Sequence, residues 1–139
     1  LRNMGVATYN LASSISLISA QRLVRRLCVH CRTPVSVSSQ SLKDLGLQTF
    51  TDQAAPQHHF YSAQGCSQCH KGYWGRIGLF QVMPITAALQ HLILHNASGH
   101  ELTAQAEKEG VNTLRHAGLL QASMGITSLS EVLAHTDVT

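Results

Sequence analysis

The sequence Cys28-Val29-His30-Cys31 recurs in pattern as Cys66-Ser67-Gln68-Cys69, and these two pairs use all four cysteines of the chain. A CxxC turn holds two sulfurs close enough to bind one ion, and two such turns supply the four thiolates of a tetrahedral zinc site. The intervening segment, residues 32–65, is longer than the usual spacing of a zinc ribbon. The pattern nevertheless predicts structural zinc, with Cys28, Cys31, Cys66 and Cys69 as its ligands.

Other uses of these residues stay open at this point. Disulfides occur mainly in small secreted domains, and the sequence shows no signal-peptide pattern. A redox CxxC normally stands alone at the start of a helix, which a duplicated pair does not match. His30 and His70 adjoin ligand cysteines and are alternative ligands, although four sulfurs already fill a tetrahedral site. Because such a closed site has no open coordination position, we expect it to stabilise the fold and not to catalyse.

Charge is distributed unevenly along the 139 residues. Residues 1–76 carry eight basic and two acidic side chains, whereas residues 77–139 carry two basic and five acidic ones. A basic half suggests nucleic-acid binding. However, four thiolates around one divalent zinc add two negative charges to that half, and Arg26, Arg32, Lys71 and Arg76 lie near the cysteines. We therefore expect the basic excess to balance the zinc cluster and expect no nucleic-acid partner.

Hydrophobic periodicity predicts an α+β fold. Apolar residues recur at helical spacing over about residues 10–20, and a strand follows over 21–27. A return strand over 73–83, covered on both faces, is expected to pair with it as a hairpin whose expanded loop is the zinc module. Residues 32–65 are polar, with one short helix near 41–47. No apolar run approaches the length of a membrane span, so no membrane insertion is expected.

The remainder of the chain is predicted to form a C-terminal helical bundle of four helices, over about 84–95, 99–109, 113–124 and 128–135. Ser98 with Glu101, and Ser128 with Glu131, fit the capping box, in which the two side chains satisfy exposed helix N–H groups. In the third helix the apolar residues Leu114, Ala117, Leu120 and Met124 recur at helical spacing, and the helix is expected to end near Gly125.

Several motifs together resemble the secretion ATPases of the type II secretion and type IV pilus assembly systems. These motifs are Gln21 to Cys28, Gly65 to Cys69, Gly72-Tyr73, Gly75 to Phe80, Thr113-Leu114-Arg115, Gly118-Leu119 and Gly125 to Val132. The resemblance covers essentially the whole chain. Gln81, Ala117 and Val29 depart from the family pattern, but none of them is a predicted zinc ligand.

The resemblance implies a C-terminal part of a hexameric motor. Its parts would be the end of a RecA-like core over 1–27, a tetracysteine zinc insertion over 28–72, a return strand over 73–83 and a helical subdomain over 84–139. In such a motor ATP and Mg²⁺ bind elsewhere, and this chain contains neither the G-x-x-x-x-G-K-[ST] phosphate-binding motif nor a Walker B strand. We therefore expect the parent protein to hydrolyse ATP and these 139 residues alone to be inactive.

The function implied is to drive pilus assembly or protein secretion by passing nucleotide-driven motion to an inner-membrane platform protein. The implied location is cytoplasmic, peripheral to the inner membrane. A free-standing zinc-ribbon module that binds nucleic acid or protein is the alternative. A role of Trp74 as a platform on which bases stack would favour it. We expect Trp74 instead to pack between the zinc turns and the return strand.

Overall fold

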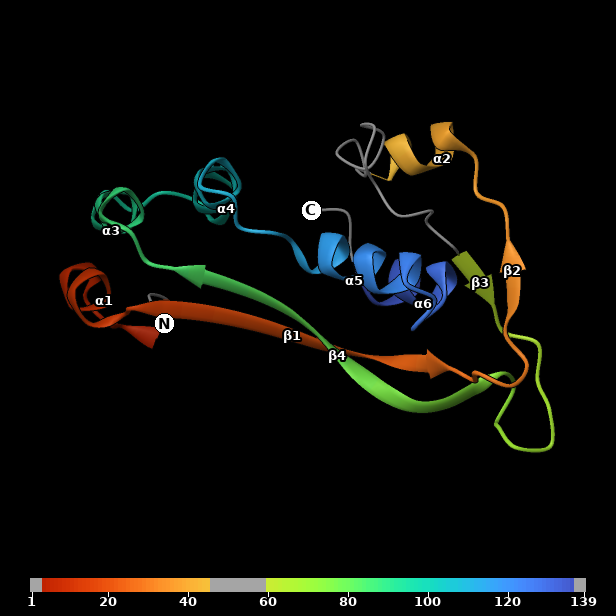
Figure 1. Ribbon diagram of the computed structural model, residues 1–139. Helices are drawn as coiled ribbons and strands as arrows, with labels where there is room; N and C mark the ends of the chain where they lie inside the picture. The colour runs from red at the N-terminus through yellow and green to blue at the C-terminus, as the bar shows by residue number, and fades with distance from the viewer. Residues whose placement is uncertain (1–3, 46–59, 137–139) are drawn as a thin grey trace. The chain divides into compact units, whose positions relative to one another are not determined.

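A computed structural model describes residues 4–45 and 60–136 of the chain (Figure 1). It contains both helices and strands, which confirms the α+β class. In chain order the elements are α1 (Thr8–Ser14), β1 (Leu17–Leu27), β2 (Thr33–Val35), α2 (Ser39–Asp44), β3 (Phe60–Ser62), β4 (Tyr73–Pro84), α3 (Ala87–Leu94), α4 (Gly99–Lys108), α5 (Leu114–Ser123) and α6 (Leu129–His135).

The strands form two small sheets. β1 pairs with β4, and their arrows run in opposite directions in Figure 1. This confirms the predicted hairpin with the cysteine segment as its expanded loop. Within that loop β2 and β3 form an antiparallel pair in which Pro34 lies opposite Tyr61. The second sheet thus pairs the chain just after the first cysteine pair with the chain just before the second pair.

The chain divides into two compact units. One unit comprises Leu1–Ala20 with Gln81–Thr113, and the other comprises Gln21–Phe80 with Leu114–Thr139. The four C-terminal helices all lie close to their predicted positions, but α3 and α4 belong to the first unit and α5 and α6 to the second. A single C-terminal bundle is therefore not confirmed.

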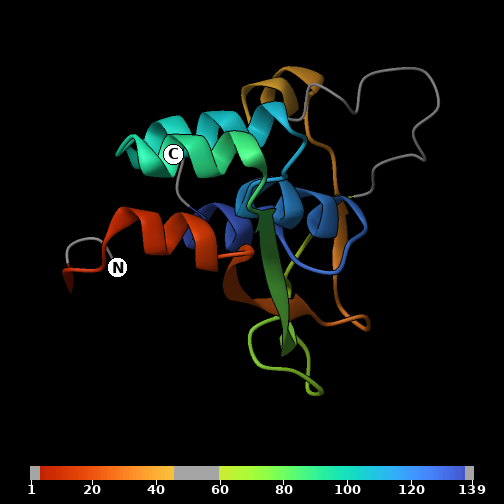
Figure 2. The same ribbon diagram turned by 90° about the vertical axis from the view of Figure 1, so that its left-hand side faces the viewer.

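In the first unit α3 packs against both α1 and α4 (Figure 2). Among the described residues of this unit, the buried side chains are Ala12, Leu89 and Ala106, one from each helix. Ser98 and Glu101 make the full predicted capping box at the start of α4, with each residue satisfying a backbone N–H of the other. Local sequence signals thus suffice to begin α4.

The second unit has its core between β3, α5 and α6. Phe60, Leu119, Ala122 and Val132 are buried together there. Leu120 and Met124, which gave the third predicted helix its periodicity, are 39% and 51% exposed, so they do not mark the buried face of α5. The close approach of α6 at Gly118 instead selects the face that carries Gly118, Leu119 and Ala122.

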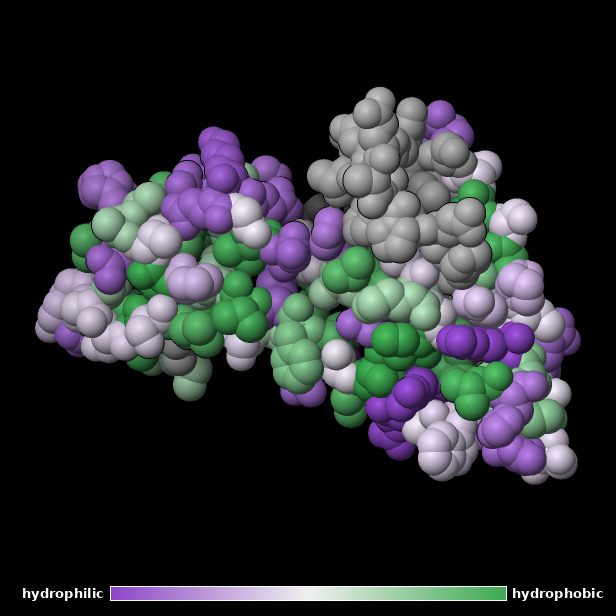
Figure 3. Space-filling model, viewed as in Figure 1, coloured by the Kyte–Doolittle hydropathy of each residue, from purple (hydrophilic) through white to green (hydrophobic). Residues whose placement is uncertain are grey.

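Two further expectations were wrong. The helix predicted over 10–20 ends at Ser14, and Leu17 already begins β1. Ile18, which the periodicity had assigned to the helix, lies in the strand that pairs with β4. β4 is not covered on both faces within the part of the chain that is described. Trp74, Phe80 and Val82 are 70%, 56% and 47% exposed, and Figure 3 shows apolar and polar side chains interspersed on the face viewed.

Gly118 offers a direct test of the α5–α6 contact. A Cβ at this position would lie 2.7 Å from Val132 Cγ1 and 3.0 Å from Leu79 Cδ1. Gly118→Ala should therefore lower the free energy of unfolding by about 1–3 kcal/mol, although alanine is the better helix former. Urea denaturation measures the effect. Gly99→Ala is the matched control, because its Cβ would meet nothing within 4 Å. Equal stability of the two variants would contradict tight packing at Gly118.

Candidate metal centre

The four cysteines are brought together at the end of the hairpin where β1 finishes and β4 begins. Cys28 directly follows β1, and Cys31 completes the turn that leads into β2. Cys66 and Cys69 lie in the second turn, between β3 and β4. Backbone bonds shape both turns: Cys31 N–H donates to Cys28 O at 3.4 Å, and Cys69 N–H to Cys66 O at 3.3 Å. The repeated CxxC sequence thus folds into two equivalent turns that face one another.

The sulfur positions match a tetrahedral ion site. All four Sγ atoms lie within 4.8 Å of one another, and this is the one cluster of potential metal ligands among the described residues. The Sγ–Sγ separations are 3.6 Å for Cys66–Cys69, 3.7 Å for Cys31–Cys69 and 3.9 Å for Cys28–Cys66. A tetrahedron with Zn–S bonds of about 2.3 Å has sulfur–sulfur edges of about 3.8 Å. The donor set therefore fits zinc in both number and spacing.

The same distances bear on the other readings of the cysteines. A disulfide requires sulfurs about 2.05 Å apart, and all four cysteines are free. The cluster includes no histidine, so neither His30 nor His70 joins the four sulfurs. His70 instead pairs through its backbone with Tyr73, in a two-residue bridge that turns the chain into β4.

Backbone N–H groups point at the sulfurs and stabilise negative charge there. Gly65 N–H donates to Cys31 Sγ and Cys66 N–H to Cys69 Sγ, each at 3.3 Å. Gly72 has a φ of +86°, and a Cβ there would lie 2.6 Å from Ala63 Cβ, so only glycine fits this turn. Gly72 O accepts from Cys28 N–H at 2.9 Å, which ties the second turn to the end of β1.

The thiols differ in acidity without a metal. Burial raises the pKa of the Cys31 thiol to about 12. Burial also opposes ionisation of Cys69, but hydrogen bonds from the Cys66 backbone and from the Cys66 and Cys31 side chains outweigh it and lower the pKa to about 7. Metal binding must therefore displace protons at neutral pH, and metal affinity falls as the pH falls.

A second set of contacts joins the end of β1 to the loop between α5 and α6. We call it the clasp and define it by Arg25, Tyr73, Thr127, Ser128 and Glu131. The Arg25 side chain donates to Glu131 Oε1 at 2.5 Å, and its backbone N–H to Oε2 at 3.0 Å. The Arg25 guanidinium also lies 4.0 Å from the centre of the Tyr73 ring.

The hydroxyls of the clasp complete it. Thr127 Oγ1 donates to Arg25 O at 2.8 Å, and the Tyr73 hydroxyl is 2.8 Å from Ser128 Oγ. Leu27 N–H donates to Ile126 O at 2.9 Å, so the last residue before Cys28 is held as well. The clasp fixes the strand that positions the first cysteine pair.

Sequence reasoning missed the clasp. Ser128 caps α6 as predicted, but the Glu131 carboxylate turns to Arg25, 106 positions away, instead of returning to the Ser128 backbone. Arg32, expected to balance thiolates, donates to Gly125 O and stacks 4.4 Å from the Tyr61 ring centre. The only signal in the sequence was the charged capping-box residue, which does not reveal its distant partner.

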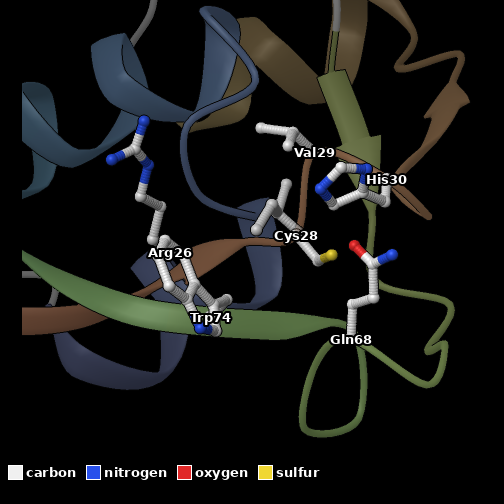
Figure 4. Close-up of a pocket in the computed structure, with 7 residues that line it drawn as sticks. Arg26, Cys28, Val29, His30, Gln68 and Trp74 are labelled. Carbon is white, nitrogen blue, oxygen red and sulfur yellow. The ribbon is translucent and has the colours of Figure 1, made fainter.

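A pocket of about 310 Å³ opens beside the cysteine cluster (Figure 4). Its lining residues are Arg26, Leu27, Cys28, Val29, His30, Gln68 and Trp74. Trp74 was expected to pack between the zinc turns and the return strand. It instead lines this pocket and is 70% exposed. Cys28 is 3% exposed, although it also lines the pocket.

The chain is similar to known secretion-system proteins. Residues 1–134 match the family described as "Type II/IV secretion system protein". The chain is 46% identical over 132 residues to the type IV pilus assembly ATPase PilB of Pseudomonas aeruginosa, covering 95% of this chain and 23% of the relative. It is 43% identical to PilB of Acinetobacter baylyi, with the same coverage. It is 35% identical to the type II secretion system ATPase E of Vibrio cholerae, covering 98% of this chain and 26% of the relative.

The chain thus spans about a quarter of the length of these relatives. Among residues 4–45 and 60–136, no helix is both long enough and apolar enough to cross a membrane.

Proposed function

The chain belongs to the type II/IV secretion system protein family, and we propose that it acts as the zinc-binding C-terminal part of a hexameric ATPase that powers type IV pilus assembly or type II secretion. The similarity to pilus assembly and secretion ATPases over nearly the whole chain supports this role. The parent protein would bind ATP and Mg²⁺ through segments other than these 139 residues, which contain no phosphate-binding loop.

The observation that carries the zinc assignment is the spacing of the four sulfurs. Separations of 3.6, 3.7 and 3.9 Å agree with the edges expected around one tetrahedral zinc. We propose Cys28, Cys31, Cys66 and Cys69 as its ligands. Zinc bound by four thiolates has no open position, so its contribution is to hold the two CxxC turns together and not to react.

Zinc would make the end of the hairpin a rigid joint. It links the turn after β1 to the turn before β4, and the clasp links β1 to α6. Motion of a RecA-like core, which we place up to residue 27, would then pass through the insertion over 28–72 and the return strand over 73–83 to the helices over 84–139. We propose that the receiver is a platform protein of the inner membrane, reached from the cytoplasmic side.

The first test is the metal content of the purified chain. Protein prepared without chelator should contain about one zinc per chain by elemental analysis, and alkylation should show all four thiols protected while the metal is bound. Protein that contains no metal, or that carries a disulfide between two of the four cysteines, would refute the zinc assignment. The family membership would be unaffected by that result.

A further inference from the structure

The two halves of the cysteine cluster differ in their access to solvent. Cys28 is buried, Cys31 and Cys69 are half-buried, and Cys66 is exposed. Zinc-bound sulfurs keep thiolate character, and the susceptibility of a cysteine to oxidation follows its thiolate character and its exposure. Exposure is therefore the property that separates Cys66 from its three partners.

We propose that Cys66 is an oxidation site, and that a peroxide converts Cys66 and Cys69 to a disulfide and releases the zinc. This inference rests on the zinc site proposed above. The Cys66 thiolate attacks the O–O bond of the peroxide, so an S–O bond forms and one oxygen leaves as hydroxide. The Cys69 thiolate then attacks the sulfur of the Cys66 sulfenic acid, which forms the S–S bond and expels the second oxygen as hydroxide. The two thiolates supply the two electrons that reduce the peroxide.

Geometry selects Cys69 as the partner. Its sulfur lies 3.6 Å from that of Cys66, so closing a disulfide requires the sulfurs to approach by about 1.6 Å. Cys28 is farther, at 3.9 Å, and its backbone is fixed by the bond from Cys28 N–H to Gly72 O. Once two of the four thiolates are tied up in a disulfide, the remaining pair is too weak a donor set to hold zinc.

The consequence should be local. Cys28 and Cys31 follow β1, which stays attached to α6 through the Arg25–Glu131 pair and to the α5–α6 loop through Leu27 and Ile126. Oxidation therefore frees the turn around residues 63–72 and leaves the clasp in place. The zinc site would thus link the rigidity of this joint to the redox state around the motor.

The experiment treats zinc-loaded protein with limiting hydrogen peroxide. Zinc release is followed with a chromogenic zinc indicator, and alkylation with peptide mass spectrometry identifies the oxidised cysteines. We expect zinc release to match the yield of the Cys66–Cys69 disulfide, Cys28 to be oxidised last, and a thiol reductant with added zinc to restore the metal. Ser67→Ala, an exposed neighbour that is not a ligand, should behave as the unmodified protein.

Cys66→His supplies a second readout, because three cysteines and one histidine also form a closed zinc site while the exposed thiolate is gone. Zinc release from this variant should be several-fold slower. If the unmodified protein holds zinc but Cys28 or Cys31 is oxidised first, or zinc stays bound after Cys66 is oxidised, this inference fails and the zinc site stands. If the purified protein holds no zinc, both fail.

Discussion

Cys66→Ser is expected to abolish zinc binding and to release the two CxxC turns while leaving α3 and α4 folded. Serine removes one of four thiolates, and structural zinc sites contribute about 10–16 kcal/mol of apparent binding energy in small zinc domains. The two CxxC turns, residues 28–31 and 63–72, are mostly polar, and only Cys28 and Gly72 are buried within them. By contrast, the first unit buries its own apolar residues, such as Leu89, which is fully buried.

Hydrogen exchange measures this effect residue by residue. Amides of residues 28–31 and 63–72 should lose protection in Cys66→Ser and equally in chelator-treated protein, whereas amides of α3 and α4 should keep theirs. Ser67→Ala should retain both the metal and the protection. Equal loss of amide protection in both regions would mean that the chain unfolds as one cooperative unit. The zinc would then not stabilise the insertion independently of the helices.

In the full-length parent the same substitution should abolish pilus assembly or secretion. ATP binding should persist, because we propose that the nucleotide binds outside these residues, which contain no phosphate-binding loop. The reason is mechanical: without zinc, the turn after β1 and the turn before β4 are no longer joined, so motion of one is not passed to the other. Normal output from a Cys66→Ser parent shown to lack zinc would demonstrate that the site is dispensable.

The sequence predicted the parts of the fold that depend on local chemistry. The paired CxxC motif predicted which four side chains meet, because each turn is set by its own four residues. Ser98 and Glu101 predicted the start of α4, since a capping box involves only residues three positions apart. The β1–β4 hairpin followed from two apolar stretches on either side of a polar insertion.

The parts it missed depend on contacts between distant residues. Which face of α5 is buried is decided by α6 at Gly118, and periodicity alone left the phase open. Ser128 and Glu131 carry the same motif as Ser98 and Glu101. Only Ser98 and Glu101 form the full capping box, in which each side chain accepts from the backbone N–H of the other residue. The difference is Arg25, which reaches Glu131 from β1 and gives its carboxylate a stronger partner than the helix backbone.

Glu131→Gln is therefore expected to destabilise the second unit, and to do so in a pH-dependent way. Glu131 is 4% exposed and accepts from both the side chain and the backbone of Arg25. Hydrogen bonds to charged groups contribute about 1.5–3 kcal/mol, so the loss should be about 2 kcal/mol at neutral pH. The isosteric amide keeps the volume but loses the charge, and only its carbonyl oxygen can accept, so its NH₂ group faces one of the two donors of Arg25.

The direction of the pH effect follows from the acidity of Glu131. Burial opposes its ionisation, but the hydrogen bonds from the Arg25 side chain and backbone outweigh burial, so the pKa lies below its ordinary value of 4.5. Because the pKa of Glu131 is lower in the folded state than in the unfolded state, its ionisation stabilises the fold. This contribution is complete above the unfolded-state pKa and is lost as the pH falls through the folded-state pKa. The difference in unfolding free energy between wild type and Glu131→Gln should be present at neutral pH and should shrink as the pH falls below about 5.

Urea denaturation of metal-free protein across this pH range separates the contribution of the clasp from that of zinc release. Glu107→Gln, an exposed change on α4, is the control and should alter stability by less than about 0.5 kcal/mol. Arg25→Met should cost more than Glu131→Gln, because it removes the positively charged partner of a buried carboxylate. Adding Glu131→Gln to Arg25→Met should then recover part of that loss. Strictly additive effects of the two substitutions, or a difference from wild type that does not vary with pH, would show that the 2.5 Å contact between Arg25 and Glu131 contributes no coupling energy to the fold.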